Sequence, residues 1–284
     1  MGLDGFIVHL KSRNCSLKTI AAYTGALRSF MRWLEDTTGS PFDPASVTPL
    51  DVADYRRYML NRNRKPATIN LHLDALSSFF SWAASNGMIS SDPTEGVKRI
   101  PEQRGAPRWL TRQELGALMR AVQKYGIPRD RALLAILLHA GLRISEAVSL
   151  HVEDVVIRER SGWVTVREGK GGKRREVPLN VTVRRIIQEW LTVHPGGDWF
   201  FPGRKGHMTA RTAEKVLEKY ARLAGVEVTP HQLRHTFCKM LVDAGESLDR
   251  VAVLAGHSNL NTTARYTRPG VQDLEKAVEK LSWE

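Results

Sequence analysis

The chain has 284 residues and is 42% hydrophobic, which is enough to bury two cores of ordinary size and excludes disorder as its main state. Lysine and arginine total 42 against 30 acidic residues, a formal charge of +12, so a polyanion, with nucleic acid first, is the expected partner. The two cysteines, Cys15 and Cys238, lie far apart and offer no disulfide framework, which fits a reducing compartment.

No segment is predicted to cross a membrane. The longest apolar run is ALLAILLHAGL, residues 132–142, and it is interrupted by His139. It is shorter than the roughly 18 residues that a membrane span requires. The first residues match neither a secretory leader nor a myristoylation motif. We therefore expect a cytoplasmic, nucleoid-associated protein with no membrane partner.

Residues 1–100 predict a small all-helical domain of about four helices. Apolar side chains recur at helical spacing over residues 16–36, behind Ser16 as a capping residue. A second helix follows the TPLD segment at residues 48–51, and a third runs from Pro66 to Gly87.

A basic cluster lies in the YRRYMLNRNRK segment of this domain, residues 55–65. We expect its cations to contact DNA phosphates, although an exposed charged face is the commoner explanation of any one such cluster. The cations are Arg56, Arg57, Arg62, Arg64 and Lys65.

Residues 101–108 predict a linker, because prolines and a glycine stand there among charged residues. The second domain, residues 109–284, is predicted to contain both helices and strands. Helices are expected at 111–126 and 129–141, then three short strands joined by SG and GKGG turns within 154–179 form a small antiparallel sheet. Four more predicted helices cover 180–193, 209–225, 229–245 and 247–256.

The TPHQLRHTF segment, residues 229–237, places His231, Arg234 and His235 on one helix face. A zinc site is disfavoured, because Arg234 would repel the metal and no glutamate follows the first histidine. An arginine beside histidines favours a phosphate instead.

The REGKGGKRREV segment, residues 167–177, is no phosphate-binding loop of the nucleotide-hydrolase kind, because it joins two strands and its glycine spacing is wrong. Lys170 lies at the predicted hairpin tip, either solvated or directed into a groove. Lys173 and Arg174 follow it and are expected to contact DNA.

Six residues together, in this order, resemble the signature of the tyrosine recombinases, the phage-integrase family, and the likeness covers nearly the whole chain. The LAGH segment ends in His257, and a tyrosine follows nine residues later in TARYTR. The six are Arg143, Lys170, His231, Arg234, His257 and Tyr266.

This resemblance implies an all-helical, SAM-like core-DNA-binding domain, then a mixed catalytic domain that is helical with a small antiparallel sheet. It implies Tyr266 as the nucleophile rather than a packing residue. Arg143 and Arg234 would bind the non-bridging phosphate oxygens, and His257 would donate a further hydrogen bond. His231 would accept the tyrosine proton and Lys170 would protonate the leaving 5′ oxygen.

Glu146 is expected to orient the neighbouring arginine or helix. The product would be a 3′-phosphotyrosyl link, which retains the phosphoester energy, so no cofactor and no metal is expected. The scattered acidic residues also argue against the metal-dependent integrase class.

The resemblance further implies a double-stranded recombination site held by a homo-tetramer, or by a hetero-tetramer with a paralogue. A terminal helix over residues 271–282 would dock on the neighbouring protomer, or else fold back on its own domain. The length favours a Xer-like or simple resolvase role over an element integrase without deciding it. Two other functions stay open: a type IB topoisomerase-like relaxing enzyme, and a DNA-binding regulator that does not cleave.

Overall fold

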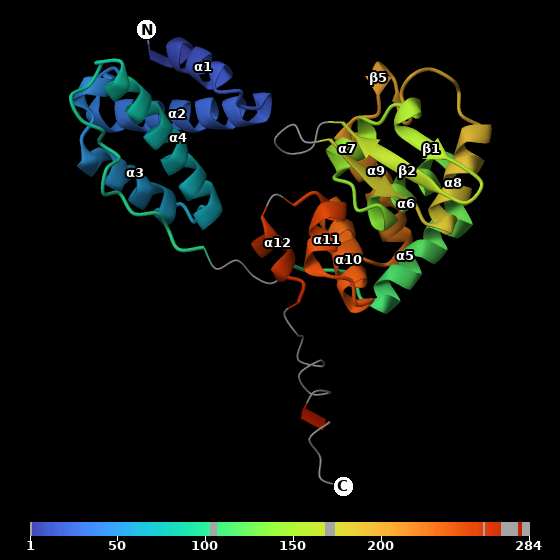
Figure 1. Cartoon of the computed structure of the whole chain (residues 1–284). Coiled ribbons are helices and arrows are strands. Elements are labelled where there is room, and N and C mark those ends of the chain that lie inside the picture. Colours follow the sequence, from blue (N-terminus) through green and yellow to red (C-terminus); the bar gives the residue numbers. More distant parts are fainter. Residues whose placement is uncertain (1, 103–106, 168–173, 258, 268–277, 280–284) are drawn as a thin grey trace. The chain divides into compact units, whose positions relative to one another are not determined.

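The computed structural model describes residues 2–102, 107–167, 174–257, 259–267 and 278–279 (Figure 1). The chain divides into two units, residues 1–104 and 105–284. The first is helical, and the second combines helices with two small antiparallel sheets. The predicted fold class is therefore confirmed.

Within its described residues, the N-terminal unit holds four α-helices and a 3-10 turn at Pro44–Ser46. Ser16 caps the second helix by accepting a hydrogen bond from the backbone N–H of Thr19, and Gly39 ends this helix in the left-handed conformation. A capping box of Thr48 and Asp51 starts the third helix. The helices are α1 (Gly2–Ser12), α2 (Leu17–Thr38), α3 (Pro49–Asn61) and α4 (Pro66–Ser85).

Aromatic and aliphatic side chains share the core of this unit. Phe6, Phe30, Phe79 and Phe80 are all fully buried. Phe6 of α1 meets Phe79 of α4 edge to face, with ring centroids 5.4 Å apart and planes at 89°. Burial of each such ring stabilises the folded unit by about 1.5 to 3 kcal/mol. Because Phe6 and Phe79 are in contact, the core joins the first and last helices of the unit.

The C-terminal unit contains eight α-helices, a 3-10 turn at Val152–Asp154 and five short strands among its described residues. The helices are α5 (Arg112–Tyr125), α6 (Pro128–His139), α7 (Ile144–Val148), α8 (Val181–Thr192), α9 (Ala210–Ala224), α10 (Pro230–Asp243), α11 (Leu248–Ala255) and α12 (Leu260–Ala264). The strands are β1 (Val155–Ile157), β2 (Gly162–Val166), β3 (Arg175–Pro178), β4 (Pro202–Gly203) and β5 (Gly206–His207).

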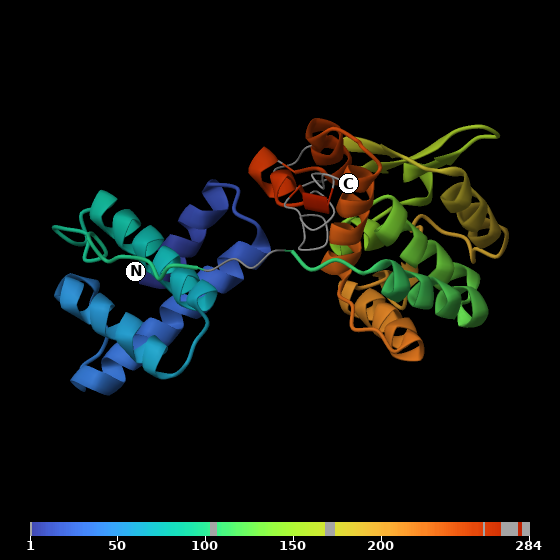
Figure 2. The ribbon, with the colours of Figure 1, turned by 90° about the horizontal axis from the view of Figure 1, so that it is seen from below.

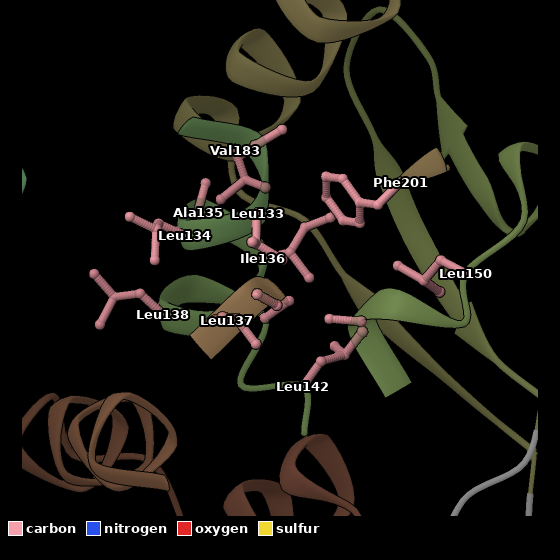
Figure 3. Close-up of a cluster of buried hydrophobic side chains, with 14 of the residues drawn as sticks. Leu133, Leu134, Ala135, Ile136, Leu137, Leu138, Leu142, Leu150, Val183 and Phe201 are labelled. Carbon is pink, nitrogen blue, oxygen red and sulfur yellow. The ribbon is translucent and has the colours of Figure 1, made fainter. Parts of the chain in front are cut away.

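Helix α6 is the centre of the C-terminal unit. Every residue from Ala132 to Leu138 is buried, so the helix is apolar on all sides. In Figure 3, Leu134 and Leu138 point to one side of the helix, whereas Ile136 points toward Phe201. The helix ends at His139, and the left-handed Gly141 follows it, two residues before Arg143.

Strands β1, β2 and β3 form an antiparallel sheet in that order. Val164 pairs with Val155 on one side and with Val177 on the other, and Val166 pairs with Arg175. Because side chains alternate along a strand, Arg175 lies on the same face as the buried Val177. Strand β3 thus begins with an arginine directed inward.

Helices α10, α11 and α12 lie side by side at one side of this unit, opposite α8 (Figure 1, Figure 2). Helix α10 also packs on α6. This packing brings together site residues from three separate segments: Arg234 on α10, His257 after α11 and Tyr266 after α12.

Several predicted features lie outside the described residues: residues 103–106 of the linker, Lys170, Lys173 and the terminal helix predicted over 271–282, apart from residues 278–279. Helices α1, α7 and α12 and the β4–β5 hairpin were not predicted, because each is short or lacks a clear apolar period in the sequence.

Replacing Gly141 by alanine should destabilise the C-terminal unit. Its φ is +61°, and an added Cβ would lie 2.2 Å from a ring carbon of the buried Phe237. Gly225 is the matched control, with φ of +64° and no atom within 4 Å of an added Cβ.

We expect Gly225→Ala to lower the free energy of unfolding by about 1 kcal/mol, from backbone strain alone. Gly141→Ala should lower it by about 1 to 3 kcal/mol more, from overpacking. Urea denaturation of both variants measures the difference. Equal losses would contradict the clash with Phe237.

Candidate active site

Two arginines converge on the carboxyl end of α11. Arg234, on α10, donates from Nη1 to the Gly141 carbonyl at 2.5 Å and from Nη2 to the Ala255 carbonyl. Arg143, the N-cap of α7, donates from Nη2 to the Gly256 carbonyl at 3.2 Å. The free carbonyls at a helix end carry partial negative charge, so they attract both guanidinium groups.

Glu146 fixes Arg143 from the other side. Its Oε1 accepts from Nη1 of Arg143 at 2.7 Å, and its Oε2 accepts from the backbone N–H of Arg143 at 2.8 Å. Burial raises the pKa of Glu146, but hydrogen bonds from Arg175 and Arg143 outweigh it and hold the pKa below its usual value. Glu146 is therefore ionised at neutral pH.

The site carries more positive than negative charge. Among the residues that the structure describes, Arg143 and Arg175 bond to the carboxylate of Glu146, and Arg234 lies within reach of its charge. Burial, and then the charge of Arg143, lower the pKa of Arg234 to about 10, which still leaves it protonated at neutral pH. Three cations against one anion, partly screened from water, make a site suited to an oxyanion.

His257 follows the left-handed Gly256 that ends α11. Its Nδ1 lies 2.9 Å from Oγ1 of the buried Thr263, in a hydrogen bond that fixes the ring. Burial, and then the charges of Arg234 and Arg143, lower the pKa of His257 to about 4. The imidazole is thus neutral at pH 7, and a bound anion would raise its pKa.

Tyr266 is buried, with only 1% of its surface exposed, two residues after α12 ends. Its Oη lies 2.5 Å from Nδ1 of His235, and its ring packs in a cluster with Phe237 and Cys238. Burial, with Cys238 adding to it, raises the pKa of Tyr266 above its usual value of 10.0, although the Arg234 charge opposes the rise. The phenol is protonated at rest.

The tyrosine's partner here is His235 rather than His231. Burial and then the neighbouring His231, Arg265 and Arg234 lower the pKa of His235 to about 4, so it is neutral at pH 7. His231, one helical turn earlier, is exposed, with its ring centroid 6.5 Å from that of His235. The role given to His231 by resemblance stays a prediction.

The predicted DNA-binding cations of the N-terminal unit differ in their surroundings. Nη1 of Arg56 donates to the Lys98 carbonyl at 2.8 Å, which ties α3 to the segment after α4. Arg57 is exposed and pairs with Asp54 at 3.1 Å. Three further cations are exposed near the start of α4: Arg62, Arg64 and Lys65.

Arg62 and Arg64 border a hollow of about 440 Å³. Trp33 and Tyr58 also line it, and the guanidinium of Arg62 lies 5.0 Å from the Tyr58 ring centroid. In the C-terminal unit, Arg174 is exposed and lies 3.6 Å from Glu176. These exposed cations are available to a polyanion.

Two residues near the site received no role from the sequence: Arg175 and Cys238. His235 was predicted on the helix face that favours a phosphate, with His231 and Arg234, but its contact with Tyr266 was not predicted. Arg175 precedes a buried valine by two residues in a strand, a pattern that places its charge on the inner face.

None of the described helices is long and apolar enough to cross a bilayer. Over the same described residues, no three histidine, cysteine or acidic side chains are grouped as metal ligands.

The two depressed histidine pKa values predict a stability that depends on pH. His235 and His257 have folded pKa values of about 4, below the usual 6.5. The unfolded chain therefore binds more protons between pH 4 and 6.5, and the folded state loses stability as pH falls through this window. The slope should reach up to about 1.4 kcal/mol per pH unit for each histidine.

Urea unfolding of the wild type and His257→Asn between pH 7 and 4.5 measures this slope, which should be shallower in the variant. His207→Asn, at an exposed position, is the control. A slope unchanged by His257→Asn would contradict the assignment.

Comparisons with known proteins show which protein family the chain resembles. A model of the phage integrase family matches residues 108–272, and one of the phage integrase N-terminal SAM-like domain matches residues 3–88. The chain is 28% identical to tyrosine recombinase XerC of Thermodesulfovibrio yellowstonii over 98% of this chain and 95% of that protein. It is 30% identical to tyrosine recombinase XerA of Pyrococcus furiosus over 99% and 93%.

Among solved structures, the chain is similar to XerH site-specific recombinase bound to its difH substrate in a pre-cleavage complex. The TM-score is 0.74 at 25% identity, over 96% of this chain and 82% of that one. Together with the arginines, histidines and tyrosine of the site, these matches show that the chain belongs to the phage integrase family of tyrosine recombinases, enzymes that transfer DNA strands.

Proposed function

We propose that this enzyme exchanges DNA strands at a specific site, with Tyr266 attacking the scissile phosphodiester. The uncompensated charge of Arg143, Arg175 and Arg234 beside one carboxylate carries the proposal, because a phosphodiester is the anion that would balance it. Tyr266 packs against Phe237 and Cys238 of α10, the helix that carries Arg234.

Phosphate binding falls to Arg143, Arg234 and His257. The two guanidinium groups offer forked donors to the non-bridging oxygens and stay charged throughout the reaction. His257 supplies a further donor, and an arriving anion favours its protonated form by opposing the arginine charges.

In the attack, Oη of Tyr266 forms a bond to phosphorus and the bond to the 5′ oxygen breaks. The phenolic proton passes to a histidine: His231 by family resemblance, or His235, whose hydrogen bond to Oη supports that role. Lys170 protonates the 5′ oxygen. The 3′-phosphotyrosyl link is then resolved by a 5′ hydroxyl of the partner strand, so the exchange consumes no ATP.

Tyr266 must become accessible before this step. A side chain that is 1% exposed cannot reach a phosphate of duplex DNA. Helix α12 has only five residues, so its rearrangement would be the simplest way to expose the phenol of Tyr266. DNA binding would favour the released state if it binds that state more tightly.

Both units would contact the duplex, joined by the linker at residues 101–108. The helical unit would use Arg57, Arg62, Arg64 and Lys65, and Arg56 to a smaller degree because of its bond to Lys98. Lys173 and Arg174 would add contacts from the C-terminal unit. Phosphate contacts of this kind make binding strongly dependent on salt.

The working assembly would be a tetramer on two recombination sites, of one protein or with a paralogue, linked by the helix predicted over residues 271–282. The XerC and XerA relatives favour a Xer-like resolution role in the cytoplasm, on the nucleoid, over integration or excision of a mobile element.

Tyr266→Phe should abolish covalent attachment to DNA and leave DNA binding within about threefold of wild type, because only the attacking oxygen is lost. The substrate is a pool of nicked duplexes with a randomised core. After cleavage, the nick lets the short fragment that carries the freed 5′ hydroxyl diffuse away. The covalent product is then trapped and can be detected on a denaturing gel. The trapped duplexes are sequenced and resynthesised as a defined site.

A covalent band that persists in Tyr266→Phe would place the nucleophile elsewhere. No band with either protein, on DNA that both bind, would favour a non-cleaving regulator. Relaxation of supercoiled DNA by the monomer, independent of sequence, would favour a topoisomerase-like enzyme.

Deletion of residues 271–284 should reduce cooperative assembly on two sites while weak binding to one site persists, since the deleted segment is proposed to bridge protomers and not to bind DNA. Gel-shift titration on one-site and two-site duplexes separates the two effects. Unchanged synapsis in the deletion variant would refute the exchange role.

A further inference from the structure

Arg175 is a largely buried cation that contributes charge to the site but has no step of its own in the mechanism above. It is the first residue of β3, and its side chain is 11% exposed. An arginine is rarely buried this deeply without a carboxylate partner. Its guanidinium is therefore committed to a contact inside the protein.

That contact is a two-pronged bond to Glu146. Nη1 of Arg175 donates to Oε1 at 3.0 Å, and Nη2 donates to Oε2 at 2.8 Å. The Glu146 side chain is only 4% exposed. Such paired N–H groups fix the plane and direction of a carboxylate, which a single ammonium cannot do.

The same two oxygens hold Arg143. Oε1 of Glu146 accepts from the Arg143 side chain and Oε2 from its backbone N–H, so both oxygens are shared by the two arginines. If Arg175 were lost, the carboxylate could rotate or take up water, and Arg143 would lose its fixed support.

The backbone at Gly256 is shaped around this arrangement. A Cβ added there would lie 2.8 Å from Cζ of Arg175, and the Gly256 carbonyl accepts from Nη2 of Arg143. Both arginines thus lie at the turn that leads into His257.

We infer that Arg175 is a positioning residue for strand cleavage, one that holds the Glu146 carboxylate so that Arg143 points at the scissile phosphate. The inference rests on the proposed function. It predicts a defect in the chemical step rather than in DNA binding, because Arg175 itself lies behind the residues that would meet DNA.

The test is single-turnover cleavage of the nicked, resynthesised site at saturating protein. Arg175→Gln should slow cleavage roughly 100-fold, the scale expected for a misplaced catalytic group, with the Kd for DNA changed less than about threefold. Arg175→Lys keeps the charge but not the fork, so it should stay at least about tenfold slow. Wild-type rates in Arg175→Gln, or full rescue by lysine, would overturn the inference.

Arg129→Gln is the matched control. Arg129 also binds a buried carboxylate of this unit, that of Asp130, at 2.9 Å, but on α6 away from the site. It should cleave at the wild-type rate with a comparable loss in Tm. A cleavage defect that follows Tm equally in both variants would make Arg175 merely structural, and would overturn the proposal.

A second substrate separates Arg143 from Lys170, which precedes Arg175 by five residues. A 5′-bridging sulfur in place of oxygen leaves without a proton. We expect Arg175→Gln to stay slow on this substrate, because phosphate binding is what it has lost. Restored cleavage would show that Arg175 acts through Lys170, and it would overturn the proposed link between Arg175 and Arg143. If the wild type forms no covalent product at all, the proposed function fails first and the inference with it.

Discussion

A single buried carboxylate organises the catalytic unit. Glu146 lies on α7 and accepts hydrogen bonds from Arg143 beside it in the sequence and from Arg175 on β3. An ion removed from water this fully is stable only if its lone pairs are satisfied, and here two guanidinium groups satisfy them. The helical part and the sheet of the unit are thereby joined at the point where the chemistry takes place.

The end of α11 is the second support. Its last carbonyls have no partner within the helix, and they accept from Arg234 and Arg143 instead. His257 follows directly, because Gly256 turns the chain in the left-handed conformation. One helix terminus therefore sets the positions of two cations and a histidine, and its needs for hydrogen bonds are met by the same groups that the reaction requires.

The sequence predicted the local features well, since these depend on neighbouring residues. The cap at Ser16, the helix that follows the TPLD segment, the helix that begins near residue 111 and the antiparallel sheet all occur as expected. Contacts between distant segments could not be predicted in the same way. Alternation along β3 points Arg175 inward, but nothing in the sequence states that its partner is Glu146, 29 residues earlier. Likewise, only tertiary packing sets His235, and not His231, against Tyr266.

Burial and the arginine charges together hold the resting site in an unreactive charge state. Burial, and then the charges of Arg234 and Arg143, keep His257 neutral, and burial keeps Tyr266 protonated beside His235. A phosphodiester reverses the first condition, because its negative charge balances the arginines and lets His257 take a proton and donate to the phosphate. That balance exists only while the phosphate is bound. Substrate binding therefore also brings the charged groups of the site into their reactive state, and release of the Tyr266 phenol is useful only at that point.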